Sequence, residues 1–436
     1  MKYFMPDSQD LVDPSFDFET ERRSTTRLRQ RDDHYAHELF RDRMLDGILV
    51  SKGIVDSFGA SGRYTIAQRQ RLLRVGAREF FRIENTPWAP IPFMGDCGAF
   101  TYVREAKPPY TVEDVSSFYV DCKFDLGIAV DHVILEYNAK WDLTPKDVPA
   151  AVAERQSITL DLAREFMAFH RSQRLPFELV GVAQGWSPDS YKHAVHELQA
   201  MGFRHIALGG MVPLKTHEII ASLRGVAAVL RKDTKLHLLG VTRTESLKEF
   251  VTLGVTSFDS TSPLRQAFKD AKDNFYSMDA EYTAVRIPQV EGNPSLQKLI
   301  SSGRVRQEEA RRLERAALDA MKKFDAGALT IPAVVAALQA YEDLYAPGDS
   351  HAEEYRRTLE DAPWKTCKCD VCKTLGHHVI LFRGAERNRR RGLHNTWVFY
   401  RRVQRAASAT SGPLANSVKS SGAPARRTLN TAAGKG

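Results

Sequence analysis

Long apolar runs are missing from this sequence. No stretch of 18 or more apolar residues occurs among its 436 residues, which excludes a transmembrane helix of the usual kind. The first seven residues, MKYFMPD, also lack the basic and then apolar layout of a secretory signal. We therefore predict a cytoplasmic protein without a membrane partner.

Cysteine is scarce as well, since the chain has only five. Two of them, Cys97 and Cys122, stand alone, and we expect reduced, buried thiols there. The other three, Cys367, Cys369 and Cys372, occupy one six-residue window. In a protein expected in the cytosol, such crowding indicates a metal site rather than disulfides.

The clustered cysteines read C-x-C-x2-C, and His394 follows 22 residues after Cys372. Three cysteines and one histidine are a common closed, tetrahedral ligand set for structural Zn2+. His377 and His378 compete with His394 for the fourth position. We expect one structural zinc per chain, held by Cys367, Cys369, Cys372 and His394.

Positive charge is unevenly distributed along the chain. The net charge is +8, yet Leu381 to Arg405 alone contains eight arginines and one acid, Glu386. Concentrated positive charge suits a polyanion such as nucleic acid, although a merely solvated face is the alternative. The candidate nucleic-acid-binding side chains are Arg387, Arg389, Arg390 and Arg391.

Short apolar segments alternate with amphipathic helices, a pattern that favours a parallel sheet. The predicted strands are Leu45–Val50, Pro92–Gly95, Leu126–Val130, Glu178–Ala183, His205–Leu208, Lys235–Leu239 and Val255–Phe258. Seven strands favour a closed (β/α)8 TIM barrel, with Thr283–Ile287 as the candidate for the eighth. Such a barrel needs about 250 residues, so the chain has room for an addition.

This pattern divides the chain into four parts. Residues 1–40 are polar and charged and are expected to form an N-terminal arm. Residues 41–290 would form the catalytic barrel, and 291–405 a helical, zinc-binding subdomain that closes it. Residues 406–436 are rich in Ser, Ala, Gly and Thr and are expected to be disordered, since they hold too few large apolar groups for a core.

Polar residues and glycines follow the predicted strands at their carboxyl ends, which form the active-site face of such a barrel. They are Asp96, Asp131, Gln184, Gly209, Gly210, Gly240 and Asp259. A single Asp after a strand is usually a helix N-cap. Three of them after different strands favour converging carboxylates that act as nucleophile, acid/base and ligand-binding group.

These residues resemble the motifs of the queuine/archaeosine tRNA-guanine transglycosylases. The chain has Asp96-Cys-Gly-Ala-Phe100 where that family has Asp-Ser-Gly-Gly-Phe/Tyr, and Phe258-Asp259 followed by Pro263 and Arg265 at the nucleophile motif. Ala183-Gln184-Gly185, Gly209-Gly210-Met211 and Leu239-Gly240-Val241 are similar to further strand ends, and the cysteine window followed by His394-Asn395 is similar to the family's zinc site.

The chain departs from the family at Cys97 and Ala99, where a serine and a second glycine are usual, and in Ser260 to Arg265. Its N-terminus and the Phe382 to Thr396 block look like the DpdA branch, which is implicated in inserting 7-cyano-7-deazaguanine (preQ0) into DNA. The resemblance therefore implies a DNA enzyme that exchanges guanine for preQ0, with possible companion proteins.

The resemblance also implies the roles of the site residues. Asp259 would be the nucleophile and Asp96 the acid/base. The substrate-binding residues would be Asp131, Gln184, Gly209, Gly210, Phe100 and Leu239. Two alternatives stay open: exchange in tRNA, and a non-catalytic zinc-and-arginine nucleic-acid-binding protein. The presence of both Asp96 and Asp259 argues against the second.

Overall fold

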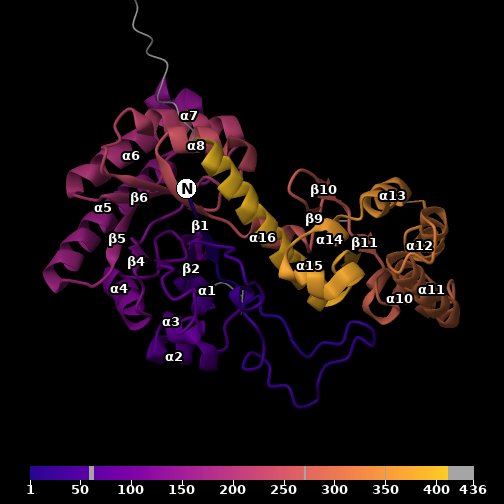
Figure 1. Ribbon diagram of the computed structural model, residues 1–436. Coiled ribbons are helices and arrows are strands. Elements are labelled where there is room, and N and C mark those ends of the chain that lie inside the picture. The colour runs from indigo at the N-terminus through magenta and orange to yellow at the C-terminus, as the bar shows by residue number, and fades with distance from the viewer. Residues whose placement is uncertain (58–62, 270–271, 349, 411–436) are drawn as a thin grey trace, which may run out of the picture.

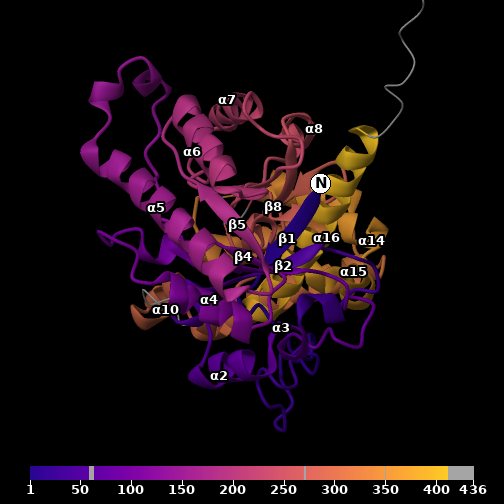
Figure 2. The same ribbon diagram turned by 90° about the vertical axis from the view of Figure 1, so that its left-hand side faces the viewer.

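A computed structural model describes residues 1–57, 63–269, 272–348 and 350–410. Within them, eight parallel strands close into a barrel in chain order, which confirms the predicted (β/α)8 barrel (Figures 1 and 2). The strands are β1 (Lys2–Pro6), β2 (Gly47–Ser51), β3 (Phe93–Asp96), β4 (Leu126–Ile128), β5 (Glu178–Ala183), β6 (His205–Leu208), β7 (Lys235–Leu238) and β8 (Val255–Asp259).

Helices cover the outside of the barrel between these strands. They are α1 (Lys52–Val55), α2 (Ile66–Val75), α3 (Ala77–Phe80), α4 (Val112–Asp121), α5 (Ala150–Gln173), α6 (Pro188–Met201), α7 (Thr216–Ala227), α8 (Leu247–Thr252) and α9 (Ser262–Gln266). Local sequence explains their ends. Ser187 caps α6 by accepting from the Ser190 N–H, Pro188 fills its first turn, and Gly202 ends it in the left-handed conformation.

The eighth strand is not Thr283–Ile287, as predicted, but the N-terminal segment β1. Phe4 pairs with Gly47 of β2 and with Asp259 of β8, so β1 closes the ring. The barrel thus begins inside the segment expected to be an arm. This strand was not predicted from the sequence because its apolar run is short and is directly followed by a long polar connection. Val285–Arg286 (β11) pairs instead with Leu381–Phe382 (β12) in a separate two-stranded sheet.

The barrel interior is filled by side chains from its strands. The apolar ones are Phe4, Leu49, Met94, Leu126, Ile128, Val180, Val182 and Ala207. On β7 and β8 the pattern changes, because the buried His237 pairs in register with Ser257. Alternate residues of a strand share a face, so Ser257 and Asp259 lie on the same side of β8. The interior is therefore polar next to the last two strands.

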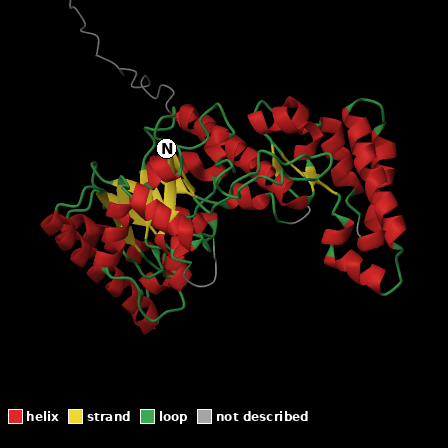
Figure 3. Cartoon of the chain, turned by 90° about the horizontal axis from the view of Figure 1, so that it is seen from below, coloured by secondary structure: helices red, strands yellow, loops and turns green. Residues whose placement is uncertain are grey.

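A second body lies beside the barrel (Figures 1 and 3). Its helices are α10 (Pro294–Ser301), α11 (Gln307–Asp325), α12 (Ile331–Tyr345), α13 (Ala352–Asp361), α14 (Pro363–Thr366) and α15 (Asp370–Leu375). It also holds an antiparallel pair, β9 (Phe275–Tyr276) with β10 (Glu281–Tyr282). The long α16 (Gly384–Thr410) runs from α15 back to the barrel, where it contacts α8 and α9 (Figure 1).

The end of α16 corrects one prediction. Residues 406–410, expected to belong to a disordered tail, are the last part of this helix. The rest of that predicted tail, 411–436, lies outside the described residues.

Candidate active site

A cavity of about 450 Å³ opens at the carboxyl ends of the barrel strands. Every residue predicted for catalysis or substrate binding lines it: Asp96, Phe100, Asp131, Gln184, Gly209, Gly210, Leu239 and Asp259. They come from distant parts of the chain, and the barrel brings them together because its parallel strands all end at one face. Phe100 is 49% exposed and lies at the rim.

Asp259, at the end of β8, is held through one of its two oxygens. Its Oδ1 accepts a hydrogen bond from the Gly240 N–H at 3.1 Å and lies 3.1 Å from Nε2 of the fully buried His237. Nδ1 of His237 is 2.9 Å from the Ser257 hydroxyl. If Ser257 donates to Nδ1, Nε2 carries the proton and donates to Asp259. Oδ2 has no hydrogen-bond partner among the described residues, so only Oδ1 is engaged by the protein.

Asp96 is buried at the end of β3 with a perturbed acidity. It accepts hydrogen bonds from the Ser51 side chain and from the backbone N–H groups of Cys97 and Gly98. Burial raises its pKa from 3.8 to about 6, and the charge of Asp259 adds to this effect, while the hydrogen bonds oppose it. A carboxyl group with a pKa near neutrality can both give and take a proton, which suits an acid/base.

Asp131 is held from both sides. Gln184 Nε2 donates to its Oδ2 at 2.6 Å, and the Cys97 thiol donates to its Oδ1 at 3.2 Å. Tyr102 in turn donates its hydroxyl proton to the Cys97 sulfur at 3.1 Å. Cys97, which replaces the serine expected from the family motif, is thus part of the hydrogen-bond network that orients Asp131.

The two glycines after β6 leave room for this network. A Cβ at Gly209 would lie 2.1 Å from Gln184 Nε2, so any side chain there would displace the amide that orients Asp131. Gly210 has a φ of +70°, and a Cβ there would lie 2.3 Å from the Ile134 carbonyl oxygen. Glycine at these two positions therefore lets the backbone come close to the cavity, where a side chain would collide with its neighbours.

The acidity of Asp131 gives a testable pH dependence. Burial raises its pKa from 3.8 to about 7, and the nearby Asp96 adds to the rise. Between these pH values the folded protein binds a proton that the unfolded chain has lost, so the free energy of unfolding falls as pH rises. Asp131→Asn should remove this pH-dependent decrease in the free energy of unfolding. A pKa change of this size corresponds to a decrease of roughly 4 kcal/mol. Chemical denaturation of both proteins should show the variant gaining stability relative to wild type from pH 4 to pH 8.

The exposed Asp147→Asn is the matched control for this measurement, because it makes the same chemical change outside the cavity. A stability difference between Asp131→Asn and wild type that does not vary with pH would contradict the assignment of a buried, protonated carboxyl group.

Several residues that line the cavity or contact Asp259 were not singled out from the sequence as site residues. His237 could have been found as a histidine inside an apolar strand, and Ser51 as a polar residue ending β2. Arg265 and Lys269 also line the cavity and add positive charge to its wall. Arg265 belongs to the nucleophile motif, but nothing in the sequence showed that its side chain lines the same cavity as Asp259.

The predicted metal ligands form one cluster in the second body. The Nδ1 atom of His394 lies 3.6, 3.3 and 3.3 Å from the sulfurs of Cys367, Cys369 and Cys372. Tetrahedral Zn2+ with ordinary bond lengths separates sulfur and nitrogen ligands by about 3.6 Å. Nε2 of His394 is 2.8 Å from the Tyr276 carbonyl oxygen, which fixes the ring so that Nδ1 faces the sulfurs. The cluster can therefore hold a metal ion such as zinc.

The two competing histidines lie elsewhere. His377 Nδ1 faces Asp325 at 3.4 Å, and His378 Nε2 faces Glu19 at 3.3 Å. Neither belongs to the group of ligand atoms around the three cysteines, whereas His394 does. The choice of His394 from the sequence agrees with this geometry.

Comparison with known proteins agrees with the geometry of both sites. The family model described as "Queuine tRNA-ribosyltransferase" matches residues 111–279. A DNA-guanine transglycosylase from Salmonella montevideo is 48% identical over 417 residues, which cover 94% of this chain and 98% of that protein. This chain belongs to the guanine transglycosylase family. The resemblance inferred from the motifs is confirmed, and the protein is a pentosyltransferase enzyme.

Other transglycosylases match a shorter part of the chain. A queuine tRNA-ribosyltransferase from Xanthomonas campestris pv. campestris is 33% identical over 129 residues, which are 29% of this chain and 34% of that protein. One from Xanthomonas oryzae pv. oryzae is 37% identical over 91 residues, 20% of this chain and 24% of that protein. Likeness to these enzymes is therefore local, whereas likeness to the Salmonella protein extends along the chain.

The structure corrects the predicted role of the arginine cluster in this transglycosylase. Arg387, Arg390 and Arg391 are at most 5% exposed. Arg387 pairs with Glu21, and Arg390 donates to Glu386 at 2.7 Å and to the Asp13 carbonyl oxygen at 2.6 Å. Arg391 donates to the carbonyl oxygens of Leu381 and Ala267 at 2.8 and 2.7 Å. These three guanidiniums hold the chain together, and the prediction that they bind phosphates is wrong.

Helix geometry explains the error. Residues 387, 390, 391 and 394 follow the i, i+3, i+4, i+7 spacing of one helix face, and this face of α16 is buried. Arg389 lies off that face, and its side chain is 25% exposed. A run of arginines in a sequence does not show which of them a helix turns inward.

No helix within the described ranges, 1–57, 63–269, 272–348 and 350–410, combines the length and the apolar composition that crossing a membrane requires.

Proposed function

We propose that this enzyme exchanges guanine in DNA for 7-cyano-7-deazaguanine through a covalent aspartyl intermediate. The observation that carries the DNA assignment is the 48% identity to a DNA-guanine transglycosylase over 94% of the chain. The chemistry is supported by two carboxylates with different environments, Asp259 and Asp96, in one cavity.

In the first half of the reaction, Oδ2 of Asp259 attacks C1′ of the target nucleotide. The C1′–N9 bond breaks, the electron pair stays on guanine, and protonated Asp96 supplies the proton that the departing base takes up. The donors on Oδ1, Gly240 N–H and His237, keep the carboxylate oriented for attack. The product of this half is free guanine and a glycosyl ester of Asp259.

In the second half, the deazaguanine base attacks C1′, loses its N9 proton to Asp96 and displaces the Asp259 carboxylate. Two displacements at one carbon retain its configuration, as in retaining glycosidases. Asp131 and Gln184 would bind the polar edge of the base, Gly209 and Gly210 would offer backbone contacts, and Phe100 and Leu239 would cover its faces. The base must leave the helix stack to reach the cavity.

Zinc has a structural role in this proposal. Cys367, Cys369, Cys372 and His394 would hold it in a closed set, and none of them lines the cavity. Bound zinc supplies folding energy to the second body.

Exchange in tRNA is the second candidate, because the family model and the Xanthomonas relatives are described as tRNA-ribosyltransferases. The two are separated by incubating the protein, with any companion proteins, with labelled preQ0 and DNA or tRNA side by side. We expect the label in DNA nucleosides and none above background in tRNA. Label in tRNA alone would reject the DNA proposal and support this second candidate.

A further inference from the structure

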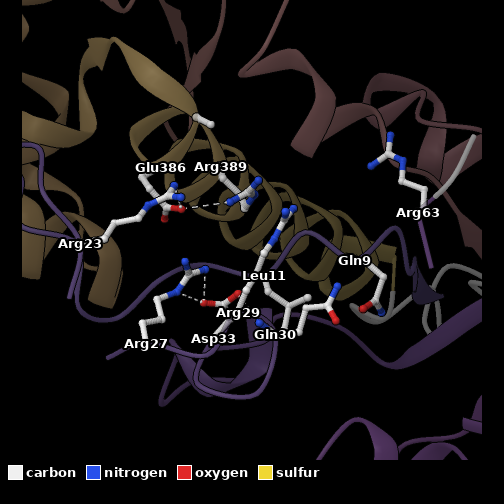
Figure 4. Close-up of a pocket in the computed structure, with 11 residues that line it drawn as sticks. Gln9, Leu11, Arg23, Arg27, Arg29, Gln30, Asp33, Arg63, Glu386 and Arg389 are labelled. Atoms are coloured by element: carbon white, nitrogen blue, oxygen red, sulfur yellow. Dashed lines mark hydrogen bonds and ion pairs between the residues drawn. The ribbon is translucent and has the colours of Figure 1, made fainter. Parts of the chain in front are cut away.

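A second pocket, of about 270 Å³, lies between the connection that follows β1 and the start of α16. Its charged lining residues are five arginines and two acids: Arg23, Arg27, Arg29, Arg63, Arg389, Asp33 and Glu386. Figure 4 shows Arg23, Arg27, Arg29 and Arg389 around one space, with Arg63 on the far side of Gln9. Among the lining residues, positive charges exceed negative ones by three, and Asp10 and Asp13, which pair with lining arginines from outside the pocket, reduce this excess to one.

We propose that this arginine-lined pocket binds a backbone phosphate of the DNA strand that carries the target nucleotide. This inference rests on the proposed function, and it adds a second contact between the enzyme and its DNA substrate, away from the base that reacts.

Some of these arginines already form ion pairs with acidic side chains of the protein. Arg27 pairs with Asp33 and with the buried Asp13 at 3.2 Å, and Arg23 pairs with Glu386 at 3.1 Å (Figure 4 draws Arg27 with Asp33). These pairs hold the guanidiniums in place without a ligand. A site that is ordered before binding loses less entropy when the ligand arrives.

The remaining arginines have donors to spare. Arg29 makes no hydrogen bond or ion pair with any residue that the structure describes. Arg63 Nη1 donates to the Ser8 carbonyl oxygen at 3.1 Å and lies 3.8 Å from Asp10, while its Nε and Nη2 have no partner among the described residues; the side chain is 40% exposed. The Nε of Arg389 is buried without a hydrogen-bond partner in the described part of the chain. A guanidinium presents its donors as a planar fork that matches two phosphate oxygens, so these three side chains suit a phosphodiester.

The position of the pocket points to DNA as the ligand. Pro6, at the end of β1, lines the active-site cavity, and Gln9, three residues later, lines the arginine pocket. Three residues span at most about 11 Å between Cα atoms. Along one strand of a duplex, phosphates rise by about 3.4 Å each, so the distance between these two lining residues corresponds to the rise of at most about three nucleotides. One strand can therefore reach both.

The test uses Arg29→Glu combined with Arg63→Glu in the full chain. Arg29 has no partner to lose among the described residues, and Arg63 loses one hydrogen bond to a backbone carbonyl oxygen and one long ion pair, so we expect the fold to be kept. The matched control is Arg174→Glu combined with Arg204→Glu, because both arginines are exposed and precede β5 and β6, at the opposite end of the barrel, and the pair changes the net charge by the same amount. The probe is a fluorescent, guanine-containing DNA oligonucleotide, titrated at several NaCl concentrations without free base.

We expect the double variant to bind this oligonucleotide at least about tenfold more weakly than the control at moderate salt. The slope of log K against log salt should become shallower by roughly 0.7–0.9 for each phosphate that the variant no longer neutralises. Binding of free guanine and the thermal unfolding midpoint should equal those of the control.

The inference is wrong if the double variant and the control bind DNA with the same affinity and slope. It is equally wrong if the double variant loses guanine binding or thermal stability in parallel with DNA binding, since that would show a structural role. Loss of binding to a companion protein with unchanged DNA binding would also overturn it, in favour of an acidic protein surface. Failure of the proposed function is a separate result, because it appears as absent preQ0 incorporation into DNA by the wild-type protein.

Discussion

Asp259→Asn should abolish base exchange, lowering the rate by about 10⁴-fold or more, as expected when the nucleophile of a covalent mechanism is removed. The amide is nearly isosteric with the carboxylate, and its oxygen can still accept from the Gly240 N–H and from His237. The fold and DNA binding should therefore stay near those of wild type. Incorporation of labelled preQ0 measures the exchange, and a denaturing gel measures the covalent adduct with DNA.

Two comparisons make this test specific. Asp96→Asn should also lose turnover, because a proton carrier is removed while the nucleophile stays. Asp147→Asn, on the surface, should exchange base at the wild-type rate. An Asp259→Asn protein that still forms an adduct resistant to denaturation would show that another group attacks C1′.

Loss of a metal ligand should have the largest effect on stability. Cys372→Ala removes one of the three sulfurs around His394 Nδ1, so bound zinc should fall well below one per chain. Metal binding energy is folding energy in such a site, and roughly 10–16 kcal/mol is typical of structural zinc in small domains. We expect the second body to lose several kcal/mol of this stabilisation, seen as a lower unfolding midpoint and faster proteolysis beyond residue 291.

His377→Ala is the matched control, because His377 lies close to the cluster in sequence but pairs with Asp325. It should keep full zinc by elemental analysis. Full zinc in His394→Ala together with loss in His377→Ala would contradict the ligand assignment.

Seven barrel strands could be predicted because each is a short apolar run between helices with clear end signals. β5 and β6 have the predicted bounds, Glu178–Ala183 and His205–Leu208. β1 could not be predicted in this way. Its five residues carry no helix before them and a long polar connection after them, and its partners, β2 and β8, are decided only when the sheet closes.

The residues of the site likewise divide into those that the sequence could predict and those that it could not. Asp96, Asp131 and Asp259 could be found because each ends or closely follows a strand, and strand ends converge in a barrel. His237 acts on Asp259 across a pair of strands, so its role depends on register and not on sequence distance. The arginines of α16 were misjudged because burial depends on what packs against a helix, and Glu21 and Asp13 come from the far end of the chain.

The sequence by itself determined seven of the eight barrel strands, the family, the Cys3His cluster and the residues predicted to line the cavity, since these depend on local patterns and side-chain chemistry. The tertiary structure alone decided how the barrel closes, which Asp259 oxygen is engaged by the protein, and which arginines face solvent. It also showed that Arg23, Arg27, Arg29 and Arg63 share one pocket with Arg389. The physical reason is that hydrogen-bond register and burial arise between segments far apart in the chain, where no local pattern records them.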